Sequence, residues 1–159
     1  MTEHKMGILA GEGSPPICVA RGASKQGYHV TGIAIKGITV PEIEEYCDVV
    51  HWCKLGRFNQ MIKILKQEDI TKMAMIGRIN QKLSLNPFNY DLRSIFVMMN
   101  LPDLRPKSIF HAIEQELDKE GIEIVDTRPF LQQYIPHKGL LTSTRELTPE
   151  EEEAIRFGY

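Results

Sequence analysis

The sequence predicts an α/β fold, a Rossmann-like parallel sheet of about five strands in the order 3-2-1-4-5 with helices on both faces. Short apolar runs alternate with amphipathic stretches along the chain, which is typical of strands joined by helical crossovers. Glycine follows two of these runs, at Gly11 and Gly77, where a strand can turn sharply into a loop. Right-handed crossovers favour the stated order, in which the first and fourth strands are neighbours.

The first strand and helix have the clearest signal. The run Met6–Ala10 breaks into Gly11-Glu12-Gly13-Ser14 and then two prolines, which predicts a strand, a tight turn and a helix start. The helix is expected over Pro15–Gln26, with Gly27 as its C-terminal stop. Such a helix points its positive end beyond the strand, where phosphate is a usual occupant.

The remaining elements follow in order. An apolar face between residues 57 and 67 predicts a helix, and a second apolar stripe, which stops at Gly121, predicts another that begins near Ser108. Residues 86–99 are dense in apolar groups and favour a helix packed on the sheet, with a methionine-rich wall for acyl chains or a membrane-surface contact as the alternative. A capping box at Thr148 predicts a final helix. The further strands are expected at His29–Ile35, Asp48–Trp52, Lys72–Ile76 and Ile122–Val125.

Composition limits the class of protein. With 159 residues, 42% hydrophobic and 25% charged, the chain is expected to form one domain with a substantial core. A net charge of -2 argues against nucleic acid as a partner. No apolar run is long enough to cross a bilayer, and three cysteines without Cys-x-x-Cys spacing favour a reducing cytoplasm. The histidines lack metal-ligand spacing, and His51 is interpreted as a hydrogen-bonded structural residue.

A dinucleotide-binding domain is one interpretation of the glycine turn. Against it, Pro16 occupies the third glycine position of Gly-x-Gly-x-x-Gly, and no hydride-transfer constellation follows. The second strand ends at Lys36, where NAD domains use an acidic residue, although a lysine leaves NADP open. An NAD(P)-binding oxidoreductase domain and a non-catalytic nucleotide-binding module therefore remain alternatives.

Short motifs matching a known family occur in order along nearly the whole chain: Gly7–Gly13, Ile35–Gly37, Trp52 with Leu55–Gly56, Met75–Ile79, Asp91–Arg93, Glu116–Ile122, Pro136–Thr142 and Ile155–Tyr159. Together they resemble the N-terminal domain of the two-domain UDP-2,3-diacylglucosamine pyrophosphatases of lipid A biosynthesis, the type unrelated to calcineurin-like phosphatases.

The resemblance implies a hydrolase that gives UMP and 2,3-diacylglucosamine 1-phosphate, with a divalent metal, Mg²⁺ or Mn²⁺, in the full enzyme. It implies a substrate-binding domain over residues 1–145, then a capped helix and linker over 146–159 that lead to a catalytic C-terminal domain absent here. We therefore expect no catalytic residue and no metal ligand in this chain, and no hydrolysis by the chain alone.

The strand order places Gly11–Ser14 and Gly77–Arg78 at one crevice, where ligands of open α/β sheets bind. The resemblance implies that glycine-loop N–H groups approach a diphosphate or sugar, and that Arg78 pairs with a phosphate oxygen; a surface arginine is the alternative. Thr142 is expected to donate its hydroxyl to the ligand or to stabilise a turn. The substrate-binding residues implied are Gly11, Glu12, Gly13, Ser14, Gly77, Arg78 and Thr142.

The chain also departs from the family. Lys107 and Ser108 stand where acidic residues are usual, which leaves the identity of the substrate open. The implied partner is a UDP-sugar lipid, and the implied location is the cytoplasm, at the inner face of the inner membrane if the chain makes a peripheral membrane contact. A homodimer also stays open.

Overall fold

The computed structural model describes residues 4–79, 90–135 and 147–158. Its sheet has five parallel strands in the order β3-β2-β1-β4-β5, which confirms the predicted fold and strand order. The strands are β1 (His4–Ala10), β2 (Tyr28–Ile35), β3 (Val49–Cys53), β4 (Lys72–Ile76) and β5 (Glu123–Ile124).

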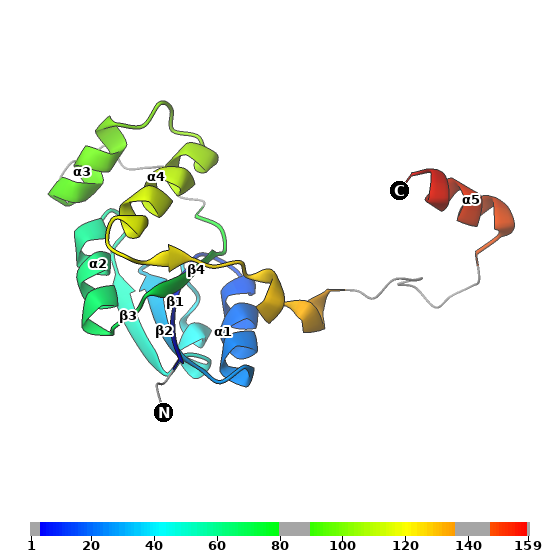
Figure 1. Ribbon diagram of the computed structural model, residues 1–159, viewed down its shortest axis with the longest axis horizontal. Helices are drawn as coiled ribbons and strands as arrows, with labels where there is room; N and C mark the ends of the chain where they lie inside the picture. The colour runs from blue at the N-terminus through cyan, green and yellow to red at the C-terminus, as the bar shows by residue number, and fades with distance from the viewer. Residues whose placement is uncertain (1–3, 80–89, 136–146, 159) are drawn as a thin grey trace.

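Helices cover both faces of the sheet, as Figure 1 shows for α1 and α2. One apolar core lies under α1 and contains Ile8 and Val30, and the other lies under α2 and contains Ile33 and Leu65. The helices are α1 (Pro15–Lys25), α2 (Phe58–Gln67), α3 (Leu92–Met99), α4 (Pro106–Asp118) and α5 (Pro149–Phe157), with short 3₁₀ turns η1 (Pro41–Glu45), η3 (Arg128–Phe130) and η4 (Gln132–Tyr134).

Four of the five strands differ from their predicted bounds: β1 and β2 begin two residues and one residue earlier than expected, β3 is displaced by one residue, and β5 is shorter. The differences in β3 and β5 have local reasons. The third strand begins after Asp48, because the Asp48 carboxylate accepts a hydrogen bond from the backbone N–H of Val30 at 2.7 Å. The fifth strand is only two residues long, because the N–H of Ile122 donates to the carbonyl of Leu117 and closes the end of α4. His51 is hydrogen-bonded, as expected, with 2.8 Å between its Nε2 and Oε1 of Glu68.

The expected packing of the apolar helix in the range 86–99 on the sheet is wrong. Its described part, α3, packs against α2 and α4 instead. The reason is that the described part of the connection from β4 to β5 carries two helices, and α4 takes the position beside β5. Residues 86–89 lie outside the described residues.

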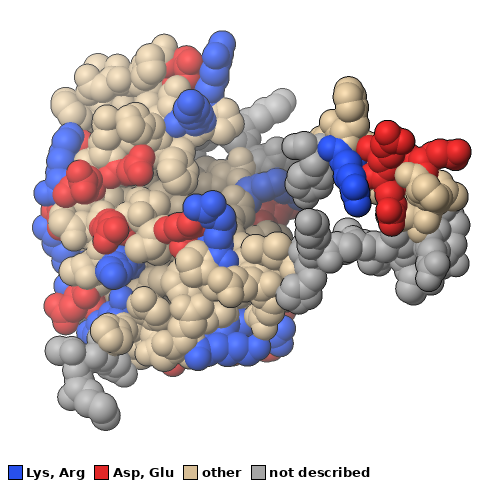
Figure 2. Space-filling view, turned by 45° about the vertical axis from the view of Figure 1, so that its right-hand side comes forward, with Lys and Arg blue, Asp and Glu red and all other residues tan. Residues whose placement is uncertain are grey.

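The capping box at Thr148 is confirmed, since its hydroxyl accepts from the N–H of Glu151 while the Glu151 side chain accepts from the N–H of Thr148. Figure 1 shows α5 apart from the sheet, and Figure 2 shows acidic side chains gathered on it. None of the described helices combines the length and the apolar character needed to cross a membrane.

Candidate functional site

The loops at the carboxyl edge of the sheet carry four basic residues. Because β1 to β4 are parallel, the residues that directly follow them lie along one edge. These short segments (11–14, 36–37, 54–57 and 77–79) contain a single carboxylate, Glu12. Their basic residues are Lys36, Lys54, Arg57 and Arg78, of which all but the half-buried Arg57 are exposed. The edge is therefore suited to an anionic ligand.

The two predicted loops meet there through their backbones. The N–H of Glu12 donates to the carbonyl of Arg78 at 2.7 Å, the N–H of Arg78 donates back at 3.3 Å, and the N–H of Gly11 donates to Ile76 at 2.8 Å. A Cβ on Gly11 would lie 2.7 Å from the Arg78 carbonyl oxygen, and one on Gly77, whose φ is +98°, 2.8 Å from Gly11. Gly11 and Gly77 are thus required for this contact, and the N–H groups of Gly11 and Glu12 already have protein acceptors.

The start of α1 offers few backbone donors. Pro15 and Pro16 have no N–H, so the first turn can present only the N–H of Ile17, together with the hydroxyl and N–H of the N-cap residue Ser14. Ser14 makes no side-chain capping bond to the helix. Gly13 has a φ of +97°, which strains any residue with a side chain. Among the predicted loop residues, Ser14 therefore remains the best-placed neutral donor for a ligand.

Arg78 lies just beyond β4 with its side chain exposed at this edge. Its backbone N–H and carbonyl hold Glu12, so its guanidinium has no part in that contact. Thr142, the remaining predicted site residue, lies outside the described residues.

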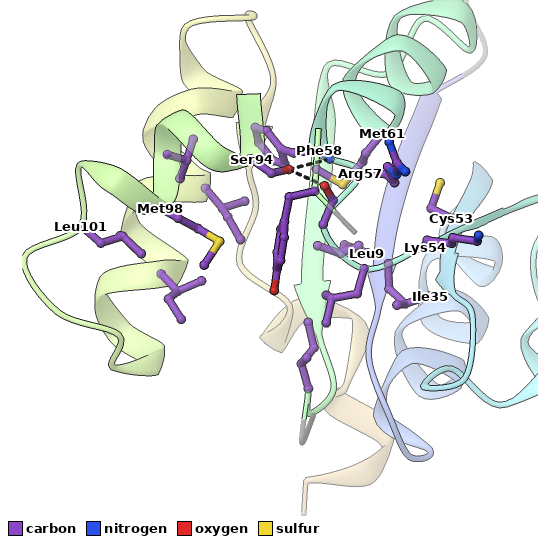
Figure 3. Close-up of a pocket in the computed structure, with 17 residues that line it drawn as sticks. Leu9, Ile35, Cys53, Lys54, Arg57, Phe58, Met61, Ser94, Met98 and Leu101 are labelled. Atoms are coloured by element: carbon purple, nitrogen blue, oxygen red, sulfur yellow. Dashed lines mark hydrogen bonds between the residues drawn. The ribbon is translucent and has the colours of Figure 1, made fainter. Parts of the chain in front are cut away.

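An apolar cavity of about 130 Å³ opens between this edge and the α3–α4 pair. Figure 3 shows side chains from β1, the ends of β2 and β3, α2 and α3 pointing toward it. Lys54, Arg57 and Ile79 also line it, so the cavity borders both the basic segment after β3 and the loop of Arg78. Its apolar lining includes Leu9, Ile35, Phe58, Met61, Val97 and Met98.

The two thiols with shifted pKa values are not activated nucleophiles. Burial raises the pKa of the Cys47 thiol to about 12. Burial also raises the pKa of Cys53, which lines the cavity, although Lys36 acts in the opposite direction. Both groups are therefore neutral thiols at pH 7, and the cavity wall stays uncharged at Cys53.

Ser94 and Asp91 fasten α3 over the cavity. The Ser94 hydroxyl donates to the carbonyl of Gly56 at 2.7 Å and accepts from the N–H of Phe58 at 3.1 Å, as Figure 3 shows. The Asp91 carboxylate accepts from the N–H of Ser94 at 2.9 Å and from the N–H of Asn59 at 2.7 Å. Asp91 therefore caps the N-termini of two helices at once.

We expect Asp91→Ala to lower the free energy of unfolding by about 2 kcal/mol, because an N-cap substitution typically costs about 1 kcal/mol and two helices lose a cap. Urea unfolding followed by circular dichroism measures the change. Asp118→Ala is the matched control, since Asp118 is an exposed helix residue whose loss should change stability by no more than about 0.5 kcal/mol. Equal stability of the two variants would contradict the double cap.

Ion pairs hold the outer side of the same helices. Nε of Arg93 lies 2.9 Å from Glu116, and its Nη1 lies 2.6 Å from Glu120. Hydrogen bonds from Lys119 and Arg93 lower the pKa of Glu116, although its burial acts in the opposite direction. Hydrogen bonds from Lys66 and Arg93 likewise lower the pKa of Glu120. The pairs join α3 to α4 and to the end of α2, so Arg93 of the Asp91–Arg93 motif is a structural residue.

The described residues do not fit a metal site: they contain no group of three or more His, Cys, Asp or Glu side chains that could hold an ion. No step is therefore assigned to a metal within this part of the chain.

Sequence reasoning missed Lys54, Arg57 and Thr39 at this edge. Lys54 has no glycine beside it and is marked only by its place directly after an apolar strand. A signal for Arg57 was present, because a basic residue next to a glycine follows three strands, at Lys36-Gly37, Gly56-Arg57 and Gly77-Arg78. Thr39 had none. It is buried, it donates to the carbonyl of Ala10 and accepts from the N–H of Ile35 at 2.8 Å, and it so ties the ends of β1 and β2 together.

Solved structures share the architecture only distantly. A crystal structure of gox2253 is 12% identical over 77% of this chain and 33% of that one, with a TM-score of 0.49. The Rhizobium etli pyruvate carboxylase T882A structure with acetyl coenzyme-A is 14% identical over 83% of this chain and 12% of that one, with a TM-score of 0.46. The chain thus spans about a third of the first protein and an eighth of the second. With TM-scores below 0.5, these likenesses carry no argument about function.

Comparison with curated proteins gives no match. The family described as the LpxI N-terminal domain matches residues 5–134, which include the whole sheet apart from the first residue of β1. LpxI is a UDP-2,3-diacylglucosamine pyrophosphatase of lipid A biosynthesis. The match covers most of the 159 residues, and the chain belongs to the LpxI N-terminal domain family.

Proposed function

We propose that this chain is the substrate-binding N-terminal half of a UDP-2,3-diacylglucosamine pyrophosphatase, which hydrolyses the pyrophosphate bond to give UMP and 2,3-diacylglucosamine 1-phosphate. The observation that carries the proposal is an apolar cavity whose rim is shared with a basic sheet edge. A ligand that fills both must be an anionic amphiphile, which a UDP-linked diacyl sugar is and a dinucleotide is not.

The basic edge supports binding of the diphosphate. Arg78 supplies a planar guanidinium suited to two phosphate oxygens, and Lys36 and Lys54 supply point charges on neighbouring loops. The neutral donor Ser14 completes the group at the start of α1. Because the N–H groups of Gly11 and Glu12 have protein acceptors, we assign the phosphate contacts to side chains more than to the glycine loop.

The cavity supports binding of an acyl chain. Its volume of about 130 Å³ is close to that of the engineered apolar cavity of about 150 Å³ that takes benzene, so it holds a few terminal methylenes and not a whole chain. Each methylene buried there contributes about 0.8 kcal/mol. The remainder of the acyl chain has to leave the cavity along α3, which forms the cavity's outer wall.

Hydrolysis itself is assigned to groups outside this chain. Attack of water on a pyrophosphate is commonly helped by a divalent metal that neutralises the developing charge. We therefore propose that the catalytic groups and the divalent metal of the full enzyme come from a second domain, and that this chain binds and orients the substrate.

The test is binding by the chain alone. Isothermal titration with a short-acyl UDP-2,3-diacylglucosamine, kept below its critical micelle concentration, should give an affinity at least tenfold above that for UDP-N-acetylglucosamine or NADPH. Equal affinity for the short-acyl substrate and UDP-N-acetylglucosamine would mean that the chain has no acyl site. Tighter binding of NADPH would favour a nicotinamide-dependent enzyme instead.

Val97→Phe should weaken binding of the short-acyl substrate roughly tenfold, because the larger ring takes the space of about two methylenes worth 0.8 kcal/mol each. Affinity for UDP-N-acetylglucosamine should not change. Ile155→Phe is the control, since it adds a ring at an exposed position of α5, away from the cavity. If both variants bind the acyl substrate like the unmodified chain, the cavity is not its acyl site.

A further inference from the structure

The outer face of α3 presents three large apolar side chains to solvent. Leu92, Phe96 and Met99 are 86%, 64% and 80% exposed. Their spacing of four and three residues places them on one side of the helix, and we call them the α3 stripe. Val97 and Met98 on the inner side line the cavity. A helix that is apolar on both sides is normally covered on both, yet the described residues leave the stripe open.

The stripe lies in a segment that has no negative charge of its own. No Asp or Glu occurs from residue 92 to residue 102, in a chain that is 25% charged. Arg105 and Lys107 follow, both exposed, and the two carboxylates that flank the segment are Asp91, which caps α3, and Asp103. Figure 2 shows the upper end of the molecule, where α3 and α4 lie, as mostly uncharged. Such a surface meets no repulsion from the phosphates of a bilayer.

We propose that the α3 stripe inserts into the surface of a lipid bilayer, with α3 lying in the interface. The helix has eight residues and is about 12 Å long, far too short to cross a hydrocarbon core of about 30 Å. Short helices with one exposed apolar face bind in the plane of the interface. The stripe then lies beside the wall of the acyl cavity, so an acyl chain can pass from the bilayer to the cavity along α3.

A second copy of the chain fits the stripe less well. A standard protein interface uses about 20 to 30 residues on each side, and three side chains provide a small part of that. The choice of a lipid surface rests on the proposed function, because a lipid substrate requires access to a bilayer. The test therefore uses vesicles without substrate, so that its failure can be told apart from failure of the hydrolase proposal.

The chain is sedimented with vesicles of phosphatidylethanolamine and phosphatidylglycerol, and separately with vesicles of phosphatidylcholine. The variant Leu92→Ser/Phe96→Ser/Met99→Ser should bind both at least tenfold more weakly than the unmodified chain. The control Ile155→Ser/Phe157→Ser removes exposed apolar groups from α5 and should bind normally. Melting temperatures of both variants should stay within a few degrees of the unmodified chain, because the altered side chains are exposed.

Insertion is measured directly by the tryptophan fluorescence of the variant Phe96→Trp. Its fluorescence should shift to the blue with vesicles and be quenched by lipids brominated on the acyl chains, whereas Trp52 of the unmodified chain, half-buried on β3, should not respond. The proposal is overturned if the unmodified chain does not bind vesicles, if the triple variant binds as well, or if binding needs phosphatidylglycerol alone. Loss of a dimer in the triple variant without loss of vesicle binding would assign the stripe to a second copy.

Discussion

Replacing Gly22 by alanine is expected to lower the free energy of unfolding by about 3 kcal/mol, at the upper end of the usual cost of overpacking. Gly22 is buried in α1, and a Cβ there would lie 2.0 Å from the carbonyl oxygen of Phe130. Helix propensity alone would make the substitution stabilising by about 1 kcal/mol. The clash prevails because the contacted atom belongs to the backbone, so η3 has to move away from α1.

The displacement also disturbs the core. Phe130 is 7% exposed and packs edge-to-face on Tyr28, with ring centroids 5.8 Å apart. Moving η3 opens this contact at the start of β2. The melting temperature should fall by roughly 10 °C, since a protein of this size loses about 2 to 4 °C for each kcal/mol.

Ser24→Ala is the matched control, because Ser24 is exposed in the same helix. It should raise stability by a few tenths of a kcal/mol through helix propensity. If Gly22→Ala is as stable as Ser24→Ala in urea and thermal unfolding, the close contact between α1 and Phe130 does not exist.

The fold could be predicted because its signals are local. The glycine turn after β1, the proline start of α1 and the apolar face of α2 each depend on residues close together in sequence. Right-handed crossovers then limit the strand order to few choices, and the predicted order is confirmed.

The packing of α3 could not be predicted in the same way. Apolar side chains such as Val97 and Leu92 carry the same signal in the sequence, yet one lines a cavity and the other is 86% exposed. Which side is covered depends on α2 and α4, which are far away in sequence. The close contact that requires glycine at position 11 could not be predicted for the same reason, because it is made with Gly77, 66 residues away in sequence.

The candidate site was predicted in part. The strand order was enough to predict that the loop Gly11–Ser14 lies beside Gly77–Arg78. The backbone hydrogen bonds between Glu12 and Arg78 confirm that the two loops are adjacent. The apolar cavity needed tertiary structure, because its lining comes from elements between Leu9 and Ile113. Whether these loops bind substrate stays a prediction, and Arg78 offers the sharpest test.

Arg78→Ala in the proposed two-domain enzyme should weaken substrate binding about ten- to a hundredfold. A hydrogen bond to a charged group contributes about 1.5 to 3 kcal/mol, and each 1.4 kcal/mol is a factor of ten in affinity. Stability should not change, because Arg78 holds Glu12 through its backbone and its side chain is exposed. Arg78→Lys should recover part of the affinity, since it keeps the charge and loses the planar pair of donors.

Lys72→Ala is the control for charge alone. Lys72 is exposed at the amino end of β4, so it removes one positive charge from the same strand at the opposite edge of the sheet. Its effect on affinity should stay within twofold in about 0.15 M salt, where screening limits interactions beyond about 8 Å. Equal losses in Lys72→Ala and Arg78→Ala would mean that net charge attracts the substrate and that the carboxyl edge is not its site. A lower melting temperature of Arg78→Ala with unchanged affinity would mean that the arginine is structural. A side chain that only contacts the substrate should change affinity and leave the stability of the free protein as it was.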